Sequence, residues 1–166
     1  MIPGSFDFTA TLFVLPPDAK LLPVSGLSPR LQAKIGYVEG DQFAVTRPGF
    51  RITTRLLPRP LAELIKEFHT PSLLNDAILR FSQTHGQDPM AMLDMAFDAL
   101  ATLVEIRILV PHDSPDTQSP EPAFGAGQEF AGYEIEVLVR ALEDTEIYRA
   151  RQADGTLIAL KISQAN

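Results

Sequence analysis

The sequence predicts an α+β fold in two parts, and three observations support this prediction. Two strand-like segments joined by a Pro-Gly turn precede three segments with helical apolar periodicity. A stretch rich in Pro, Ser and Gly then interrupts both patterns. The last part of the chain alternates apolar and polar residues, which is typical of strands. We therefore expect an α+β module over residues 1–111, a linker over 112–128 and a short β segment over 129–166.

The composition favours one ordinary domain, or one small domain with an additional segment. The chain has 166 residues, 45% of them hydrophobic, which is enough to form a buried core. No apolar run approaches the roughly 18–20 residues that span a membrane, and residues 2–15 lack signal-peptide features. The absence of Cys excludes disulfides and thiolate sites and fits a cytoplasmic protein. The three His residues are too scattered to predict a metal site.

The charge is acidic and uneven along the chain. The net charge is −7, from 14 basic and 21 acidic residues. Residues 1–112 carry 10 basic and 11 acidic side chains (−1), whereas residues 113–166 carry 4 and 10 (−6). Modules that bind nucleic acid normally present a basic surface to the phosphates. The charge therefore argues against DNA or RNA as the main partner.

A hairpin is the central β element predicted in the first part. Gln42–Arg47 and Phe50–Leu57 are strand-like, and Pro48-Gly49 between them has the chemistry of a turn. Phe6–Leu15 is rich in Phe, Thr, Val and Leu and predicts a further strand near the N-terminus. The other short elements expected are a return strand at Asp18–Val24 and a helix from Ser28-Pro29 to Lys34.

Three amphipathic helices are predicted after the hairpin. Leu61, Leu64, Ile65 and Phe68 have the spacing of one helix face. Thr70-Pro71 and Asp88-Pro89 each combine an N-cap residue with Pro at the first helical position. We expect helices that begin near Pro60, Pro71 and Pro89, followed by a strand at Ile106–Val110.

Residues 112–128 read HDSPDTQSPEPAFGAGQ and predict a solvated linker. Pro115, Pro120 and Pro122 each restrict the preceding residue to extended conformations. Apolar periodicity is absent from the stretch. A long surface loop within one domain is the alternative that these residues leave open.

Three strands in the last part predict an antiparallel meander. Tyr133, Ile135 and Val137 alternate with glutamates, as in a strand with one apolar side. Asp154-Gly155 is a strong hairpin signal. The expected strands are Tyr133–Val139, Glu146–Gln152 and Thr156–Ile162.

This meander resembles the opening of the protein-kinase small lobe. Its three strands are matched in order by Tyr133-Glu134-Ile135, Ile147-Tyr148-Arg149-Ala150 and Ile158-Ala159-Leu160-Lys161. The resemblance implies that Lys161 contacts the phosphates of a nucleotide, whose charge a fixed ammonium offsets. The alternative is a solvated lysine on an ordinary strand.

The meander also departs from the kinase pattern. Val139–Thr145 stands in place of the Gly-rich loop, contains no Gly, and puts Glu143 and Asp144 where phosphate would lie. The catalytic loop and the metal-binding Asp-Phe-Gly motif are absent. We therefore expect no catalytic residue, metal site or cofactor in this chain, whereas ATP and Mg²⁺ would serve the rest of a kinase-like parent protein.

The first part resembles a second family, the RiPP recognition element, a small winged-helix module that binds leader peptides of ribosomally made natural products. Gln42–Val110 has the size and element order of that family, a hairpin followed by three helices. Some peptide-modifying enzymes join such modules to kinase-like or lanthionine-synthetase-like regions. The resemblance implies strand addition, in which an extended peptide pairs with an edge strand. The receiving edge would be Phe50–Leu57, with the Pro89–Val104 helix alongside.

A basic cluster accompanies this expected edge. Residues 28–60 carry six basic and two acidic side chains, a local excess of +4. Such an excess would favour an acidic peptide. The alternative is a solvated, charged edge that discourages aggregation. The residues predicted to bind the peptide are Arg47, Arg51, Arg55 and Arg59.

These observations predict a non-catalytic binding or docking region of a kinase-like peptide-modifying protein, with a peptide or protein as partner. The alternative is a regulatory or dimerisation domain of a bacterial Ser/Thr protein kinase, in which exposed strand edges pair to form a homodimer. A winged-helix DNA binder is opposed by the acidic charge. A free-standing enzyme is not expected, because no Ser/His/Asp arrangement or metal motif is present. Neither nucleic acid nor a membrane is expected as a partner.

Overall fold

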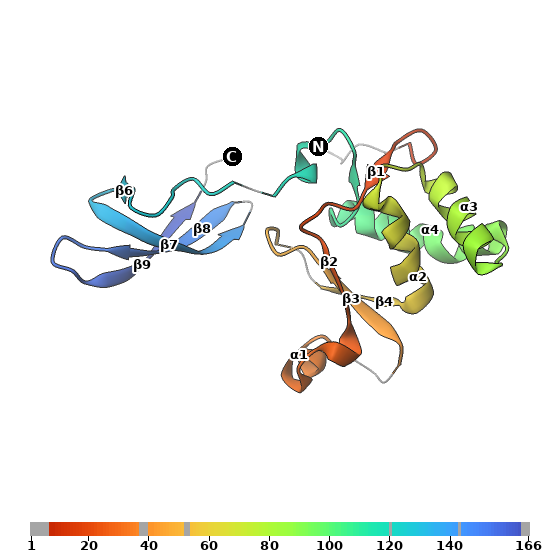
Figure 1. The fold of residues 1–166 in the computed structure, drawn as a ribbon, viewed down its shortest axis with the longest axis horizontal. Helices are drawn as coiled ribbons and strands as arrows, with labels where there is room; N and C mark the ends of the chain where they lie inside the picture. The colour runs from red at the N-terminus through yellow and green to blue at the C-terminus, as the bar shows by residue number, and fades with distance from the viewer. Residues whose placement is uncertain (1–6, 37–39, 52–53, 120, 143, 164–166) are drawn as a thin grey trace. The chain divides into compact units, whose positions relative to one another are not determined.

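The computed structural model describes residues 7–36, 40–51, 54–119, 121–142 and 144–163. The chain divides into two compact units, each treated separately below (Figure 1). The first comprises Met1–Arg47 and Ile52–Gln118, and the second Pro48–Arg51 and Ser119–Asn166. Helix and antiparallel sheet are both present, so the predicted α+β class is confirmed at this level.

The main sheet of the first unit has the strand order β2-β3-β4 and is antiparallel throughout. The strands are β2 (Lys20–Pro23), β3 (Gln42–Thr46) and β4 (Arg55–Pro58). The antiparallel pairing of the two predicted hairpin strands is therefore confirmed, with Phe43 opposite Leu57, but the connection from Thr46 to Arg55 is longer than the predicted Pro48-Gly49 turn. Strand β2 lies within the expected return strand Asp18–Val24, but it pairs with β3 and not with β1 (Phe13–Val14). Strand β4 begins later than predicted, at Arg55.

The predicted strand Phe6–Leu15 is wrong over most of its length. Phe6 lies outside the described residues, and of the described residues 7–15 only β1 (Phe13–Val14) is a strand, which pairs with β5 (Val110–Pro111). The preceding residues turn instead, because the Asp7 carboxylate accepts hydrogen bonds from the backbone N–H and the hydroxyl of Thr9. The strand predicted at Ile106–Val110 is likewise reduced to β5, since the chain turns at Arg107 with φ 59°.

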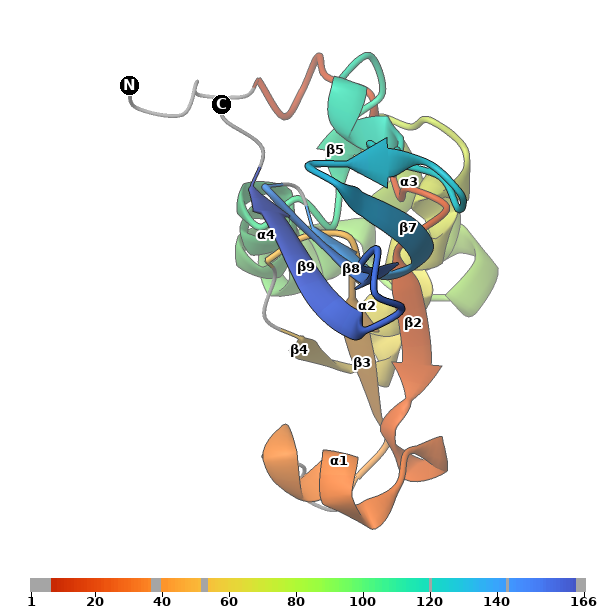
Figure 2. The same cartoon turned by 90° about the vertical axis from the view of Figure 1, so that its left-hand side faces the viewer.

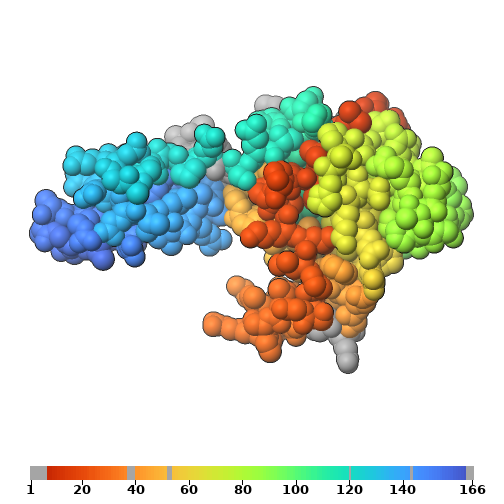
Figure 3. Space-filling model, in the orientation of Figure 1, coloured from red at the N-terminus to blue at the C-terminus, as the bar shows by residue number. Residues whose placement is uncertain are grey.

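The described residues of the first unit contain four α-helices. The helix expected from Pro60 is α2 (Arg59–Leu64), continued by the 3-10 turn η2 (Ile65–His69). Figure 3 shows these residues packed beside α3 (Leu74–His85). The other two are α4 (Pro89–Glu105) and α1 (Pro29–Lys34), and α1 follows the 3-10 turn η1 (Val24–Gly26).

The two predicted caps have different outcomes. The Asp88 carboxylate accepts a hydrogen bond from the Met90 N–H and caps α4, as expected. Thr70 does not cap α3, which begins four residues later at Leu74. The reason is a tertiary contact, because Ser72 exchanges two backbone hydrogen bonds with Phe13 and so remains extended.

The helices bury their apolar faces in one core with β3 and β4. Val45 and Leu57 contribute from the sheet. Fully or nearly fully buried members from the helical elements are Leu64, Ile65, Phe68, Ala77, Phe81, Ala96, Leu100 and Leu103. Helix α1 contributes no buried residue and lies at the opposite end of β2 and β3 from α3 and α4 (Figure 1).

The second unit is a curled four-stranded antiparallel sheet with the order β6-β7-β8-β9 (Figure 2). The three predicted strands are found as β7 (Tyr133–Leu142), β8 (Thr145–Arg151) and β9 (Leu157–Ser163). The short strand β6 (Glu129–Phe130) was not predicted. Two register shifts in β7 bend the sheet, as β-bulges do. Its small core is centred on Ile135, Tyr148 and Ala150.

Residues 112–128, predicted to be a solvated linker, are divided between the two units at Gln118/Ser119. The first part forms the 3-10 turn η3 (Pro115–Thr117), in which the Ser114 hydroxyl accepts a hydrogen bond from the Asp116 N–H. Further along, the N–H of Ala123 donates to the Glu146 carboxylate. Much of this segment is therefore held by specific hydrogen bonds.

Among the described residues, no helix combines the length and the apolar content that crossing a membrane requires.

Replacing the α4 cap by Asp88→Ala should lower the free energy of unfolding of the first unit by about 1 kcal/mol, because one helix N–H loses its acceptor. Thr70→Ala is the matched control and should have little effect, since Thr70 caps no helix. Urea unfolding followed by circular dichroism measures both. Equal losses in the two variants would contradict this assignment of the caps.

Candidate functional site

The open side of strand β4 is the feature of the first unit best suited to recognition. Strand β4 lies at the end of the sheet order, and among the described residues only β3 pairs with it. Its outer N–H and C=O groups therefore face away from the sheet and can pair with another extended chain. Pro58 ends the strand, and Pro60 follows within the first turn of α2.

Helix α2 is the helix that packs beside this edge. It packs on β3 and β4, and both Leu61 and Leu64 are buried in the shared core. The sequence prediction had placed the Pro89–Val104 helix alongside the edge. The structure gives that place to α2, because the chain passes directly from Pro58 into the helix.

Arg55 is the one predicted arginine whose guanidinium is available at this edge. It begins β4 opposite Val45, and its side chain is exposed. Among the described residues it has neither an ion-pair partner nor a hydrogen-bond partner for its side chain. Its binding of a peptide stays a prediction.

Arg59 lies at the start of α2 and is held by two carboxylates. Its Nη1 lies 3.0 Å from Asp41 Oδ2, and its Nε lies 3.1 Å from Glu63 Oε1. The hydrogen bond from Arg59 lowers the pKa of Glu63, and the hydrogen bonds to Glu63 and Asp41 raise the pKa of Arg59. The pairs are exposed, so they add little stability, but they neutralise the charge that Arg59 was predicted to present.

Arg51 belongs to the second unit and is also paired. Its Nε lies 3.0 Å from both carboxylate oxygens of Asp144, and its Nη2 donates to the Thr145 hydroxyl. The hydrogen bond from Arg51 is the main cause that lowers the pKa of Asp144. The charge of Arg51 is therefore neutralised within the second unit.

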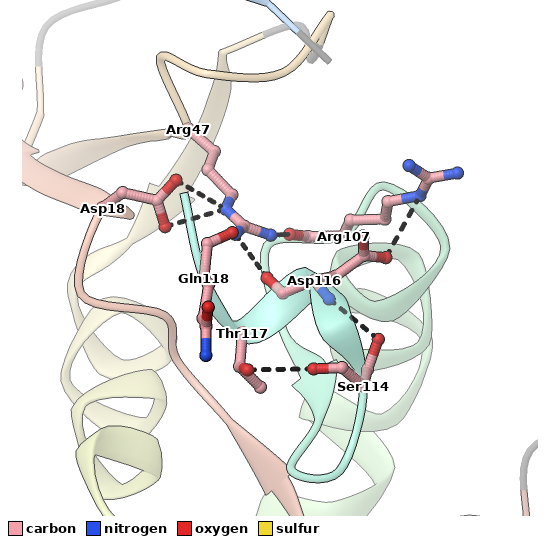
Figure 4. A network of polar contacts seen from close by, with 7 residues as sticks. All are labelled: Asp18, Arg47, Arg107, Ser114, Asp116, Thr117 and Gln118. Carbon is pink, nitrogen blue, oxygen red and sulfur yellow. Dashed lines mark hydrogen bonds and ion pairs between the residues drawn. The ribbon is translucent and has the colours of Figure 1, made fainter. Parts of the chain in front are cut away.

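Arg47 is completely buried, which contradicts its predicted place on an exposed peptide-binding edge. Figure 4 shows the network of polar contacts that its guanidinium makes. Its Nε donates to both carboxylate oxygens of Asp18, at 2.9 and 3.1 Å. Its two terminal nitrogens donate to backbone carbonyls of three residues that follow α4, namely Arg107, Asp116 and Gln118. A buried guanidinium with this many acceptors is satisfied, and its role is structural.

The residues that sequence reasoning missed are the acceptors of this network. Asp18 lies 29 positions before Arg47, and Arg107 lies 60 positions after it. The Ser114-Pro115-Asp116 turn was a usable local signal, because a Ser before Pro is an N-cap pattern. Nothing in that pattern identifies Arg47 as the donor.

Lys161 lies in β9, on the exposed face of the second unit's sheet. It is opposite Ile147, and Ala159 shares its face two residues earlier. Arg149 and Arg151 lie on the same face, but both form ion pairs with Glu136, which lies at a register shift of β7. Those pairs lower the pKa of Glu136 against the effect of burial.

The hairpin between β7 and β8 does not fit a phosphate cradle. Strand β7 continues to Leu142 and β8 begins at Thr145, so the stretch predicted as a loop, Val139–Thr145, is largely strand. The described residues of the turn include no Gly, and the Asp144 carboxylate is held ionised by Arg51. A phosphate beside this turn would meet negative charge rather than a series of N–H groups.

A buried polar pair lies on the opposite face of this sheet. The Tyr148 hydroxyl donates to Glu146 Oε2 at 2.6 Å and accepts from the Phe124 N–H at 3.1 Å. Glu146 also accepts from the Ala123 N–H. Burial, followed by the hydrogen bond to Glu146, raises the pKa of the Tyr148 phenol. This pair holds the segment before β6 on the sheet and is not open to a ligand.

The described residues contain no cluster of His, Asp or Glu arranged to hold a metal ion. Comparisons of the chain with protein-family models, with curated proteins and with solved structures found no match.

Arg47→Met should lower the free energy of unfolding of the first unit by about 3–5 kcal/mol, because it leaves Asp18 without its buried partner. Arg55→Met is the matched control, and it should cost little because that side chain is exposed. Urea unfolding measures both. A loss in Arg47→Met no larger than in the control would contradict the structural role of Arg47.

Tyr148→Phe tests the buried polar pair. The folded chain holds the phenol proton more tightly than the unfolded chain, whose tyrosine pKa is about 10, so the stabilisation is complete below that pH and is lost as the pH rises above it. At neutral pH the variant should therefore lose about 1–2 kcal/mol relative to the native chain. The difference should shrink in alkaline solution, as measured by urea unfolding.

Tyr133→Phe provides the control for that pH series, because no hydrogen bond of its hydroxyl occurs among the described residues. A Tyr148→Phe loss that stayed constant with pH would show that the phenol does not titrate as the buried site requires.

Proposed function

We propose that this chain is the non-catalytic binding region of a kinase-like peptide-modifying protein, and that it recognises an extended peptide by strand addition to β4. The observation that carries the proposal is the open outer edge of β4 beside α2. A winged-helix-like module of the RiPP-recognition type is the arrangement we propose for the first unit. Its order of three antiparallel strands followed by α2, α3 and α4 supports this.

Strand addition explains how so small an edge can bind. Main-chain hydrogen bonds of the peptide to β4 would supply affinity that is independent of sequence. Specificity would come from side chains beside the edge, contributed by β4 and the exposed residues of α2. The short length of β4, four residues, limits the number of such bonds and favours a peptide that makes further side-chain contacts.

The negative charge expected of the peptide is smaller than the excess of basic residues in 28–60 suggested. Arg47 is buried on Asp18, Arg51 is paired with Asp144, and Arg59 is paired with Asp41 and Glu63. Of these four arginines, Arg55 is the one whose side-chain donors have no partner among the described residues. We therefore propose that the peptide carries one acidic side chain near Arg55, rather than an acidic stretch.

The kinase-like relationship is supported by the order and pairing of β7, β8 and β9, with Ala159 and Lys161 on one face. Because the β7–β8 turn does not fit phosphate, we assign no nucleotide step to Lys161 in this chain. ATP and Mg²⁺ would belong to the rest of the proposed parent protein, which we propose to be cytoplasmic.

The test is selection of binders from a display library of random linear peptides, followed by NMR with the ¹⁵N-labelled chain. Binding should shift the amide signals of Arg55–Leu57 and of α2. Arg55→Glu should weaken a selected acidic peptide about three- to tenfold, as expected for loss and reversal of an exposed ion pair. Arg30→Glu is the matched control, since it makes the same charge change on the exposed face of α1 and should leave affinity unchanged.

Two results would contradict the proposal. One is a selection that yields no peptide with saturable binding. The other is a peptide whose binding shifts signals away from β4 and α2 and responds equally to Arg55→Glu and Arg30→Glu.

A further inference from the structure

Strand β9 is a longer open edge than β4 among the described residues, and it ends the strand order of the sheet in the second unit. Its seven residues, Leu157–Ser163, pair with β8 on one side (Figure 2). No described strand pairs with its other side. An open strand of this length is a template for pairing with another chain.

The hairpin geometry determines which backbone groups face outward. Gln152 N–H donates to the Thr156 carbonyl at 2.9 Å, so this pair is of the hydrogen-bonded type. Hydrogen-bonded and non-hydrogen-bonded pairs alternate along an antiparallel ladder. Ile158, Leu160 and Ile162 therefore bond to β8, and the outward groups belong to Leu157, Ala159, Lys161 and Ser163.

The side chains of β9 leave an apolar row incomplete at this edge. Ile158, Leu160 and Ile162 pack against the Tyr148 cluster, yet each remains only half-buried. A strand added at the edge would cover their open flank, and an apolar row on that strand would be the best cover.

We propose that a second copy of this chain pairs with β9, antiparallel, about a two-fold axis at Leu160. Leu160 is the centre of the strand, so this register overlaps the strand over its full length. It places Ala159 opposite Lys161 of the second copy, and Leu157 opposite Ser163. These residues are the ones with outward backbone groups, so the hydrogen-bond alternation is satisfied without a bulge.

Strand β9 is its own best partner, because its apolar row is symmetric about the axis. Isoleucines occupy the positions two residues before and two residues after Leu160. The pairing brings Leu160 against its own copy and Ile158 against Ile162, at non-hydrogen-bonded positions where side chains approach most closely. The strand's charged residue, Lys161, faces Ala159 and not another lysine. An isologous interface of this kind closes at two copies.

The dimer is independent of the peptide proposal, since it uses β9 rather than β4. Sedimentation equilibrium of the full chain should show a mass that rises from 18.2 kDa toward twice that value through the micromolar range. Arg55→Glu should not alter this rise. Loss of peptide binding and loss of dimerisation are therefore separate outcomes.

A charge series at Ala159 tests the register. This side chain is exposed, so the substitutions leave the core intact. Ala159→Glu should tighten the dimer and Ala159→Lys should weaken it, each about tenfold, because residue 159 faces Lys161 of the other copy twice by symmetry. Ala159→Lys combined with Lys161→Glu should restore it. Arg149 lies opposite Ala159 within one copy, so a charged residue at position 159 also interacts with Arg149. Thermal melting at low concentration therefore checks that each variant folds.

Ala159→Pro gives an independent test, because it removes an outward N–H and leaves the bonds to β8 in place. That variant should stay monomeric, whereas Ala159→Thr, which keeps the N–H, should dimerise. A constant mass of 18.2 kDa at all concentrations would overturn the proposal. So would a dimer that responds equally to Ala159→Glu and Ala159→Lys, or one that survives Ala159→Pro.

Discussion

The buried guanidinium of Arg47 is the constraint on which the first unit depends. The N–H groups of a buried arginine need hydrogen-bond acceptors within the protein, because a buried charge without partners lowers the stability of the fold. Asp18, just before β2, supplies the counter-charge, and the carbonyls after α4 supply the remaining acceptors. One side chain at the end of β3 thus joins the beginning of the sheet to the end of the helical part. The carbonyls of Asp116 and Gln118, which follow α4, are held by hydrogen bonds from this group.

The burial and pairing of the arginines limit where the first unit could recognise a charged partner. A local excess of basic residues in the sequence suggests a basic surface, but charges count only where they are exposed and unpaired. Burial removes Arg47 from the surface, and carboxylates neutralise Arg59. The proposed recognition at β4 would therefore rest on backbone hydrogen bonds and on Arg55.

The sequence predicted those features that short-range chemistry determines. Asp88 and Pro89 specify the start of α4, and Asp154 and Gly155 specify the last hairpin, because cap and turn lie within a few residues. Thr70 failed as a cap because Phe13, far away in the chain, holds Ser72 extended. Arg47 was misplaced for the same reason, as its partners lie 29 to 71 positions away. Local patterns carry no information about such contacts, whereas they predicted β7, β8 and β9 closely.

The open edges of β4 and β9 differ in the features that select a partner. Strand β4 is short, ends in Pro58 and carries Arg55, so it resists repeated pairing and is suited to one extended peptide. Strand β9 is longer and lacks proline, and its apolar row is symmetric about Leu160. An edge that matches its own sequence gains most from a second copy, because each favourable contact then occurs twice. Edge length, proline content and internal symmetry therefore support the proposed peptide binding in the first unit and the proposed self-association in the second.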